Sequence, residues 1–303
     1  MNPNTCAYLI VTCNGEATLS TLLDSIPSNS TILVIDNDSK DATKDILQQR
    51  GIRYIANTKN RGYGAAINQG LSLLQENHPF VVVLNQDIIL TDFHPRLSDY
   101  ASAAIIQPLI LLPTGQVNVD TLRINMFGYV YAPHFGKYVS HLQKEETMFF
   151  SGAAFIIHTN KWKKVGPFDE SLFLYYEDVD YAFRVFLQGE QIIFDPSLMV
   201  THNYHNTFLH KAKRTLLSIN RKIVMSRYLP KAWQRLIFLP TMHTKNTIME
   251  QQKWKIASQV LPLALLGFYT KQIPVWKRIL INIVLVPYSF CIRWWLKTLA
   301  SRF

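Results

Sequence analysis

Four short apolar runs, rich in β-branched residues, alternate with polar segments of helix-like length in the first third of this 303-residue chain. The runs are AYLIVT, TILVI, IRYIA and FVVVL, at residues 7–12, 31–35, 52–56 and 80–84. Such alternation is typical of successive β-α-β units, which build a parallel sheet with helices on both faces. We therefore expect an α/β fold with a mostly parallel, Rossmann-like sheet.

Polar residues follow each of the four runs. Ligands of open α/β sheets bind outside the carboxyl ends of the strands, so these side chains are expected to gather at one edge. Asp36 and Asn37 also suit a helix cap or an Asx-turn, but a polar cluster at every strand end is what a nucleotide crevice requires. The full set is Thr12, Asn14 and Glu16 after the first run, Asp36 and Asn37 after the second, Asn60, Arg61 and Gly62 after the third, and Asn85, Gln86 and Asp87 after the fourth.

The segment 57–70, NTKNRGYGAAINQG, places Gly62 and Gly64 ahead of an expected helix. Glycines let the backbone approach a ligand closely, and a helix N-terminus favours phosphate. Two glycines are also common in a loop that binds no ligand. We expect Asn68 on the inner face of this helix.

The segment 149–189 carries a small-residue turn with Gly152 at its centre, a GPFDE turn and an acidic cluster. The cluster, which includes Glu177 and Asp178, follows the aromatic stretch FLYY. Burial beside apolar aromatics tunes the pKa of a carboxyl group, so a proton acceptor is expected here. The run EDVD also suits a helix start, where acids are favoured, and both interpretations can hold together.

The motifs SGA, GPFDE and YYEDVD, in this order and at these spacings, resemble the acceptor-side half of glycosyltransferase family 2. The segment NRGYGAAINQG is similar to that family's glycine-containing motif, and the resemblance covers roughly residues 5–205. It implies a GT-A-like fold and an inverting transfer in which Asp178 is the general base, with Glu177 holding it or the acceptor. It also implies that Asp36, and then Asn37, contact the nucleobase or ribose, and that Asn68 and Gly152 belong to the nucleotide-sugar site.

The family carries a D-x-D or N-P-D signature where this chain has Asn85-Gln86-Asp87. The resemblance implies that Asp87 ligates Mg²⁺ or Mn²⁺, which bridges the diphosphate of the donor. One protein carboxylate together with phosphate oxygens suffices for such hard cations. His202, in VTHNYHN, would reach the diphosphate or the metal, although a lone histidine is also common as a structural residue.

Charge divides the chain unevenly. Residues 196–303 hold 17 Lys or Arg and one acid, Glu250, whereas residues 1–195 hold 14 basic and 20 acidic residues. We therefore expect a catalytic domain at 1–210 and a basic, aromatic-rich helical region at 211–303, directed to an anionic surface. Long aliphatic runs between the basic residues suit a bilayer edge better than a nucleic-acid groove, so no nucleic-acid partner is expected.

Two uncharged stretches, 256–270 and 279–292, would reach only roughly 21–23 Å as helices, against a hydrocarbon core of about 30 Å. In-plane association with the membrane therefore fits better than a span, and a packed helical subdomain is the alternative. Tryptophans stand beside Lys or Arg, as at a membrane boundary: Trp254, Trp276, Trp294 and Trp295.

Three cysteines without metal spacing favour a reducing compartment, and the polar start MNPNT shows no signal peptide. We expect a cytoplasmic protein, peripheral on the inner face of the bacterial cell membrane.

The chain most resembles bacterial rhamnosyltransferases of surface-polysaccharide synthesis. Their donor would be dTDP-rhamnose, with a UDP-sugar as the other possibility, and their acceptor a glycan or a polyprenyl-linked glycan. Galactofuranosyl, glucosyl and galactosyl transferases share the motifs. A sugar-phosphate nucleotidyltransferase would need a basic, glycine-rich loop at residues 12–17, where the chain has TCNGEA. A non-catalytic membrane scaffold is disfavoured by the intact Asp87 and Asp178.

Overall fold

A computed structural model describes residues 6–125, 128–203 and 210–228. These residues fall into two compact units, one with 6–123, 131–203 and 210–220, the other with 124–125, 128–130 and 221–228. All of the predicted site residues belong to the first unit. The predicted membrane-associated stretches and their four tryptophans lie outside the described residues.

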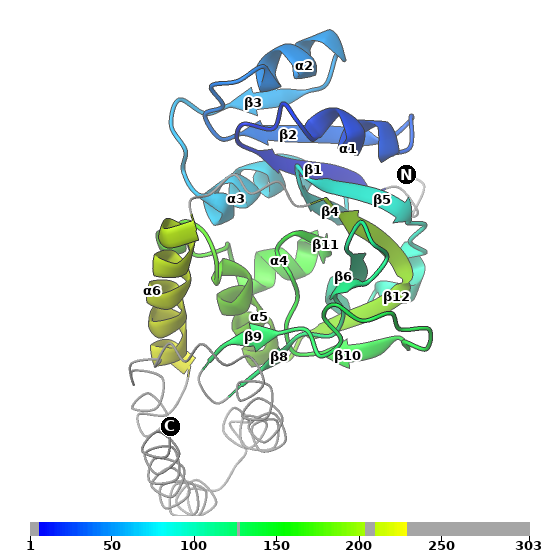
Figure 1. Cartoon of the computed structure of the whole chain (residues 1–303), viewed down its shortest axis with the longest axis vertical. Helices are drawn as coiled ribbons and strands as arrows, with labels where there is room; N and C mark the ends of the chain where they lie inside the picture. Colours follow the sequence, from blue (N-terminus) through cyan, green and yellow to red (C-terminus); the bar gives the residue numbers. More distant parts are fainter. Residues whose placement is uncertain (1–5, 126–127, 204–209, 229–303) are drawn as a thin grey trace, which may run out of the picture. The chain divides into compact units, whose positions relative to one another are not determined.

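The first third of the chain has the predicted alternation of strands and helices (Figure 1). Its third strand is shorter than predicted and begins at Tyr54. The elements are β1 (Ala7–Thr12), α1 (Leu19–Ser25), β2 (Thr31–Asp36), α2 (Thr43–Gln49), β3 (Tyr54–Ala56), α3 (Tyr63–Leu74) and β4 (Phe80–Asn85).

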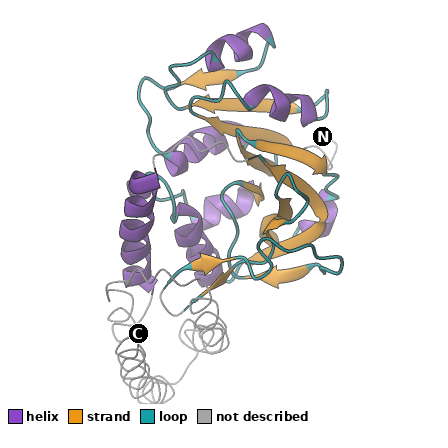
Figure 2. Cartoon of the chain, viewed as in Figure 1, coloured by secondary structure: helices purple, strands orange, loops and turns teal. Residues whose placement is uncertain are grey.

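The rest of the described chain adds further strands, several of them antiparallel to their neighbours, and the helix that carries the acidic cluster (Figure 2). The elements are β5 (Ile88–Asp92), a 3₁₀ turn (Leu97–Tyr100), β6 (Ala103–Leu111), β7 (Val117–Val119), β8 (Arg123–Ile124), β9 (Val130–Tyr131), β10 (Glu145–Thr147), β11 (Ala154–His158), α4 (Thr159–Val165), a 3₁₀ turn (Glu170–Leu172), α5 (Glu177–Leu187), β12 (Gln191–His202) and α6 (His210–Tyr228). Strands β8 and β9 pair with each other, and the other described strands join one sheet. Helix α6 runs on into the second unit.

The main sheet is mixed and has the order β10-β12-β6-β11-β4-β1-β2-β3, with β5 on β12 and β7 on β6. Strands β4, β1, β2 and β3 are parallel, as predicted, and β6 and β12 are parallel to each other. Strand β11 runs antiparallel between β4 and β6. The register pairs Thr12 with Asp36 and Val11 with Asn85, so the carboxyl ends of β1, β2 and β4 meet at one edge.

Helices cover both faces of the parallel strands. Leu19 of α1 is buried in the same cluster as Tyr8 and Ile10 of β1. Helix α3 packs on the opposite face, where Gly70 lies against the side chain of Leu9. Because successive side chains of a strand point to opposite faces, Leu9 and its two neighbours place α1 and α3 on different sides of the sheet.

Candidate active site

The loops that follow β1 and β2 are joined by hydrogen bonds. The main-chain N–H of Asn14 donates to Ser39 Oγ at 2.8 Å, and Asn14 Oδ1 accepts from Lys40 N at 2.8 Å. Glu16 N donates to Asp41 Oδ2 at 3.0 Å. The first two predicted polar clusters therefore form one rim, in which Asn14 and Glu16 bind the neighbouring loop.

Gln86 fastens the loop after β4 to the same rim. Its Oε1 accepts from Thr12 Oγ1 at 2.6 Å and from Cys13 N at 2.8 Å. The neighbouring Asn85 donates its main-chain N–H to Ala153 O at 2.9 Å, which connects this strand end to the entry of β11. Three of the four predicted clusters thus meet through direct bonds.

Asp36 is fully buried and keeps one oxygen without a protein partner. Its Oδ1 accepts from the N–H of Ser39 at 3.1 Å and from the Ser39 hydroxyl, whereas its Oδ2 is buried and makes no hydrogen bond. A buried carboxylate oxygen without a donor is costly. An N–H or O–H group of a ligand at this rim would satisfy it.

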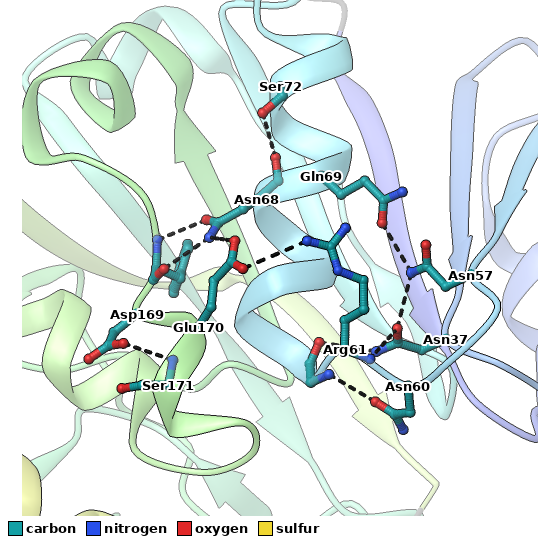
Figure 3. A network of polar contacts seen from close by, with 12 residues as sticks. Asn37, Asn57, Asn60, Arg61, Asn68, Gln69, Ser72, Asp169, Glu170 and Ser171 are labelled. Carbon is teal, nitrogen blue, oxygen red and sulfur yellow. Dashed lines mark hydrogen bonds and ion pairs between the residues drawn. The ribbon is translucent and has the colours of Figure 1, made fainter.

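Asn37 builds the loop that leads into α3 (Figure 3). Its Oδ1 accepts from Arg61 N at 3.2 Å and from Asn57 Nδ2 at 3.1 Å, and its Nδ2 donates to Gly62 O at 3.0 Å. Asn60 Oδ1 accepts from Gly62 N at 2.9 Å. The loop 57–62 is therefore held next to the other three strand ends, as predicted, by side chains that bond to protein atoms.

Asn68 joins α3 to the GPFDE turn (Figure 3). Its Oδ1 accepts from Phe168 N at 2.8 Å, and its Nδ2 donates to Phe168 O at 2.9 Å and to Glu170 Oε1 at 3.1 Å. Arg61 lies 3.8 Å from Glu170 Oε2. Asn68 faces inward, as predicted, but its amide group forms hydrogen bonds with the GPFDE turn.

Glu177 and Asp178 open α5, as the EDVD motif predicted. Asp178 Oδ2 accepts from Gly152 N at 2.9 Å, and Asp178 Oδ1 accepts from Val179 N at 2.8 Å. Glu177 is 4% exposed, and its Oε2 makes no hydrogen bond. The main chain of Gly152 thus holds one acid, while the neighbouring acid is enclosed.

Burial separates the protonation states of these two acids. Burial, and then the charge of Asp178, raise the pKa of Glu177 to about 8, and burial also raises the pKa of Asp178. The N–H groups of Gly152 and Val179 donate to Asp178 and favour its charged form, whereas Glu177 Oε2 has no donor. Burial and the neighbouring charge thus favour the neutral form of Glu177, whereas the backbone donors favour the charged form of Asp178.

Tyr63, which we did not predict, connects the acids to α3. Its hydroxyl donates to Gly152 O, and its N–H donates to Phe173 O at 2.7 Å. Burial, and then the charges of Glu177, Asp178 and Asp87, raise its pKa well above the ordinary value. Tyr63 therefore stays protonated as a hydrogen-bond donor among three acids. Its place directly after Gly62 in NRGYG was the available signal in the sequence.

Asp87 and His202 face each other at the ends of β4 and β12. Asp87 Oδ1 lies 3.2 Å from His202 Nε2, yet it makes no hydrogen bond. His202 Nδ1 lies 3.3 Å from Asn118 Oδ1, so the imidazole lies between an amide and a carboxylate. Within the described residues no three His, Cys, Asp or Glu side chains gather as a metal cage, so further ligands would come from elsewhere.

The Glu177→Gln variant tests the assignment of the buried proton. Because the pKa of Glu177 is about 8 in the folded protein and ordinarily 4.5, its neutral carboxyl stabilises the fold at low pH, and this stabilisation is lost as pH rises from 4.5 through about 8. Glutamine cannot ionise. The free energy of unfolding of the Glu177→Gln variant should therefore rise relative to that of the wild type, by up to about 1.4 kcal/mol per pH unit in that window.

Urea denaturation between about pH 5 and pH 9 measures this difference. The exposed Glu145 of β10 supplies the control, because Glu145→Gln should follow the wild type at every pH. A difference between Glu177→Gln and wild type that stays constant with pH would contradict the assignment.

Comparison with known proteins places this geometry in a family. The profile of Glycosyl transferase family 2 matches residues 8–166, more than half of the chain. The N-acetylglucosaminyl-diphospho-decaprenol L-rhamnosyltransferase of Mycobacterium tuberculosis is 27% identical over 214 residues, which cover 61% of this chain and 67% of that protein. The low-salt glycan biosynthesis hexosyltransferase Agl10 of Haloferax volcanii is 25% identical over 193 residues, covering 59% of this chain and 60% of that one.

Among solved structures, GalNAc-T7 with UDP, GalNAc and Mn²⁺ matches with a TM-score of 0.65 at 14% identity, over 90% of this chain and 59% of that chain. The likeness shows a GT-A-like fold, and the chain spans about three fifths of the length of GalNAc-T7 and of the Haloferax protein. With the profile matching from β1 to the end of α4, this chain belongs to glycosyltransferase family 2, as its motifs predicted.

Proposed function

We propose that this protein is an inverting glycosyltransferase that moves a sugar from a nucleotide-diphosphate donor to a hydroxyl group of a glycan or lipid-linked glycan. The observation that carries the proposal is Asp178, held by Gly152 N at 2.9 Å beside the enclosed Glu177. Transfer with inversion needs one carboxylate that accepts the proton of the attacking hydroxyl. Asp178 suits that need because the N–H of Gly152 fixes its orientation and the raised pKa of Glu177 favours a proton on the neighbouring acid.

The rim made by the loops after β1, β2 and β4 is the proposed nucleotide site. Asp36 Oδ2, buried without a protein donor, would accept from the base or the ribose. The remaining residues that we assign to this site are Thr12, Asn14, Glu16, Asn37, Asn60, Arg61, Gly62, Asn68, Asn85, Gln86 and Gly152. Several of them act by shaping the loops, since their bonds go to other protein atoms.

Asp87 and His202 fit a divalent cation. A carboxylate oxygen and an imidazole nitrogen 3.2 Å apart would supply two of about six ligands, and the donor diphosphate and water would complete the shell. A bound Mg²⁺ or Mn²⁺ neutralises charge that develops on the departing diphosphate. Asn118 orients His202 through Nδ1, a contact of the kind that fixes the tautomer of metal-binding histidines.

Rhamnose is the favoured sugar and dTDP-rhamnose the favoured donor, on a polyprenyl-linked glycan in bacterial cell-surface polysaccharide synthesis. The support is the likeness to an L-rhamnosyltransferase whose name specifies a diphospho-decaprenol acceptor. Galactofuranose, glucose and galactose on UDP are the other candidates. Hydrolysis of these four sugar nucleotides in the presence of Mn²⁺ would rank them.

Asp178→Asn should abolish transfer and leave nucleotide binding nearly unchanged, because the amide keeps the shape but cannot accept a proton. The expected loss of turnover is on the order of 10²–10⁴. Turnover with the preferred donor and calorimetric affinity for its nucleoside diphosphate measure the two effects. Activity within about threefold of wild type would assign the base elsewhere.

Asp87→Ala should weaken the binding of nucleoside diphosphate in Mg²⁺ or Mn²⁺ far more than in EDTA, because only the metal-bridged complex uses this carboxylate. Calorimetry in both buffers measures the difference, and Asp92→Ala, at the exposed end of β5, is the matched control. Equal affinities of the wild type with and without metal would rule out the metal role.

We also propose that residues 211–303 associate with the inner face of the cell membrane from the cytoplasm. After residue 195 the chain holds 17 basic residues and one acid, and this positive charge supports attraction to anionic lipid. None of the helices in the described part of the chain has the length and apolar character needed to cross a bilayer.

Truncation after Tyr228 should release the protein from anionic liposomes. Each well-placed basic residue adds about 1 kcal/mol of attraction that fades with salt, whereas inserted tryptophans do not respond to salt. Sedimentation with vesicles at low and high salt separates these contributions. If the full chain fails to bind anionic vesicles at low salt, the proposed membrane association is wrong.

A further inference from the structure

The loop from Leu172 to Tyr176, directly before the two acids, is bound by the side chain of Asn220 on α6. We propose that Asn220 is a positioning residue, which holds this loop in a strained conformation and thereby fixes the start of α5 and Asp178. Its importance for catalysis rests on the function proposed above, whereas its hold on the loop does not.

Backbone strain is concentrated in this loop. Five non-glycine residues of the described chain have a positive φ, and three of them are the aromatic residues Phe173, Tyr175 and Tyr176, at 47°, 70° and 71°. Asn and Asp tolerate this region, but bulky side chains rarely adopt it. The N–H of Leu174 donates to Leu172 O at 2.5 Å across Phe173, which forms a tight γ-turn of the rare positive-φ kind. Such a segment persists only where its surroundings hold it.

Asn220 supplies that hold through one amide group. Its Nδ2 lies 2.6 Å from Leu172 O, 2.9 Å from Leu174 O and 2.9 Å from Tyr175 O. The residue is 4% exposed. Three converging carbonyl oxygens accept only from a donor, so they determine which end of the amide faces them. The side chain therefore binds the loop on both sides of Phe173.

The opposite side of the loop rests on the start of α3. Tyr63 N donates to Phe173 O at 2.7 Å. A Cβ atom at Gly62 would come within 2.6 Å of that same oxygen, and Gly62 has a φ of 90°. The loop is thus fixed between the glycine-containing motif and Asn220.

Helix α5 depends on this support because its own cap is weak. Its N-cap residue is Tyr176, which has a left-handed backbone and makes no capping hydrogen bond with its side chain. Asp178 lies two residues further on. A relaxed loop would therefore shift the helix start and lengthen the bond from Gly152 N to Asp178 Oδ2.

Two variants of the full-length protein separate the loss of the donor from a change of charge. Asn220→Asp keeps the shape and turns a carboxylate toward three carbonyl oxygens, whereas Asn220→Leu keeps the branching and removes the donors without charge. Ile219→Asp is the control, because Ile219 is the exposed neighbour on the same helix and receives the same charge.

Hydrogen exchange by mass spectrometry measures the hold on the loop. In both Asn220 variants, exchange in residues 171–181 should rise by about tenfold or more, since each lost bond changes an opening equilibrium by roughly that factor. Residues 19–49, which carry α1 and α2, should exchange as in wild type, and so should the whole of Ile219→Asp. Unchanged exchange in 171–181, or an equal rise throughout the chain, would overturn the proposal.

Turnover with the preferred sugar nucleotide tests the link to catalysis. We expect it to fall by about tenfold or more in both variants, with a smaller change in the Kd of the nucleoside diphosphate alone. Faster exchange in the loop with turnover equal to wild type would show that Asn220 does not position Asp178. A wild type without activity on any donor would contradict the proposed function, and the exchange experiment would still decide whether Asn220 holds the loop.

Discussion

The hydrogen bond from Gly152 N to Asp178 Oδ2 is the interaction on which the geometry of the site depends. It ties the start of α5 to the turn that enters β11. The same peptide segment accepts from the hydroxyl of Tyr63 through Gly152 O, and a Cβ at Gly152 would lie 3.3 Å from the Tyr63 ring. One glycine without a side chain therefore lets an acid, a phenol and a strand meet at a single point.

Much of the fold was predictable, because local patterns and long-range structure agree there. The β-branched runs became β1 to β4, and the EDVD motif became the start of α5. Strand β12, Gln191–His202, extends well beyond the apolar residues at its start. Pro196 lies inside this strand, and a proline argues against a strand when only the sequence is read. The strand tolerates it because the pairing of β12 with β6 is irregular between Asp195 and Met199. The antiparallel insertion of β11 depends on distant partners and left no local signal.

The candidate site was predictable in its membership and less so in its contacts. Residue type and position at a strand end identified the rim and the acids. Asn68 and Asn37 show the limit, since each was assigned to the donor and each bonds to protein atoms. Asn220 was missed because nothing in the sequence distinguishes it from other helical asparagines, and Tyr63 was missed although it stands in the NRGYG motif. The positioning roles of these two residues depend on side-chain direction and on backbone strain, and neither can be read from a single sequence.

Strand β11 has a consequence for the order in which the molecule assembles. Of the strands in the described residues, it alone is hydrogen-bonded both to the parallel half, through β4, and to the half that contains β6. The parallel half is complete by residue 85, whereas β11 ends at His158. During synthesis the two halves therefore cannot close into one sheet until His158 has left the ribosome, and long-range pairing of this kind is slow. The turn at Gly152 lies at the seam, so the acid-bearing edge forms among the last parts of the sheet.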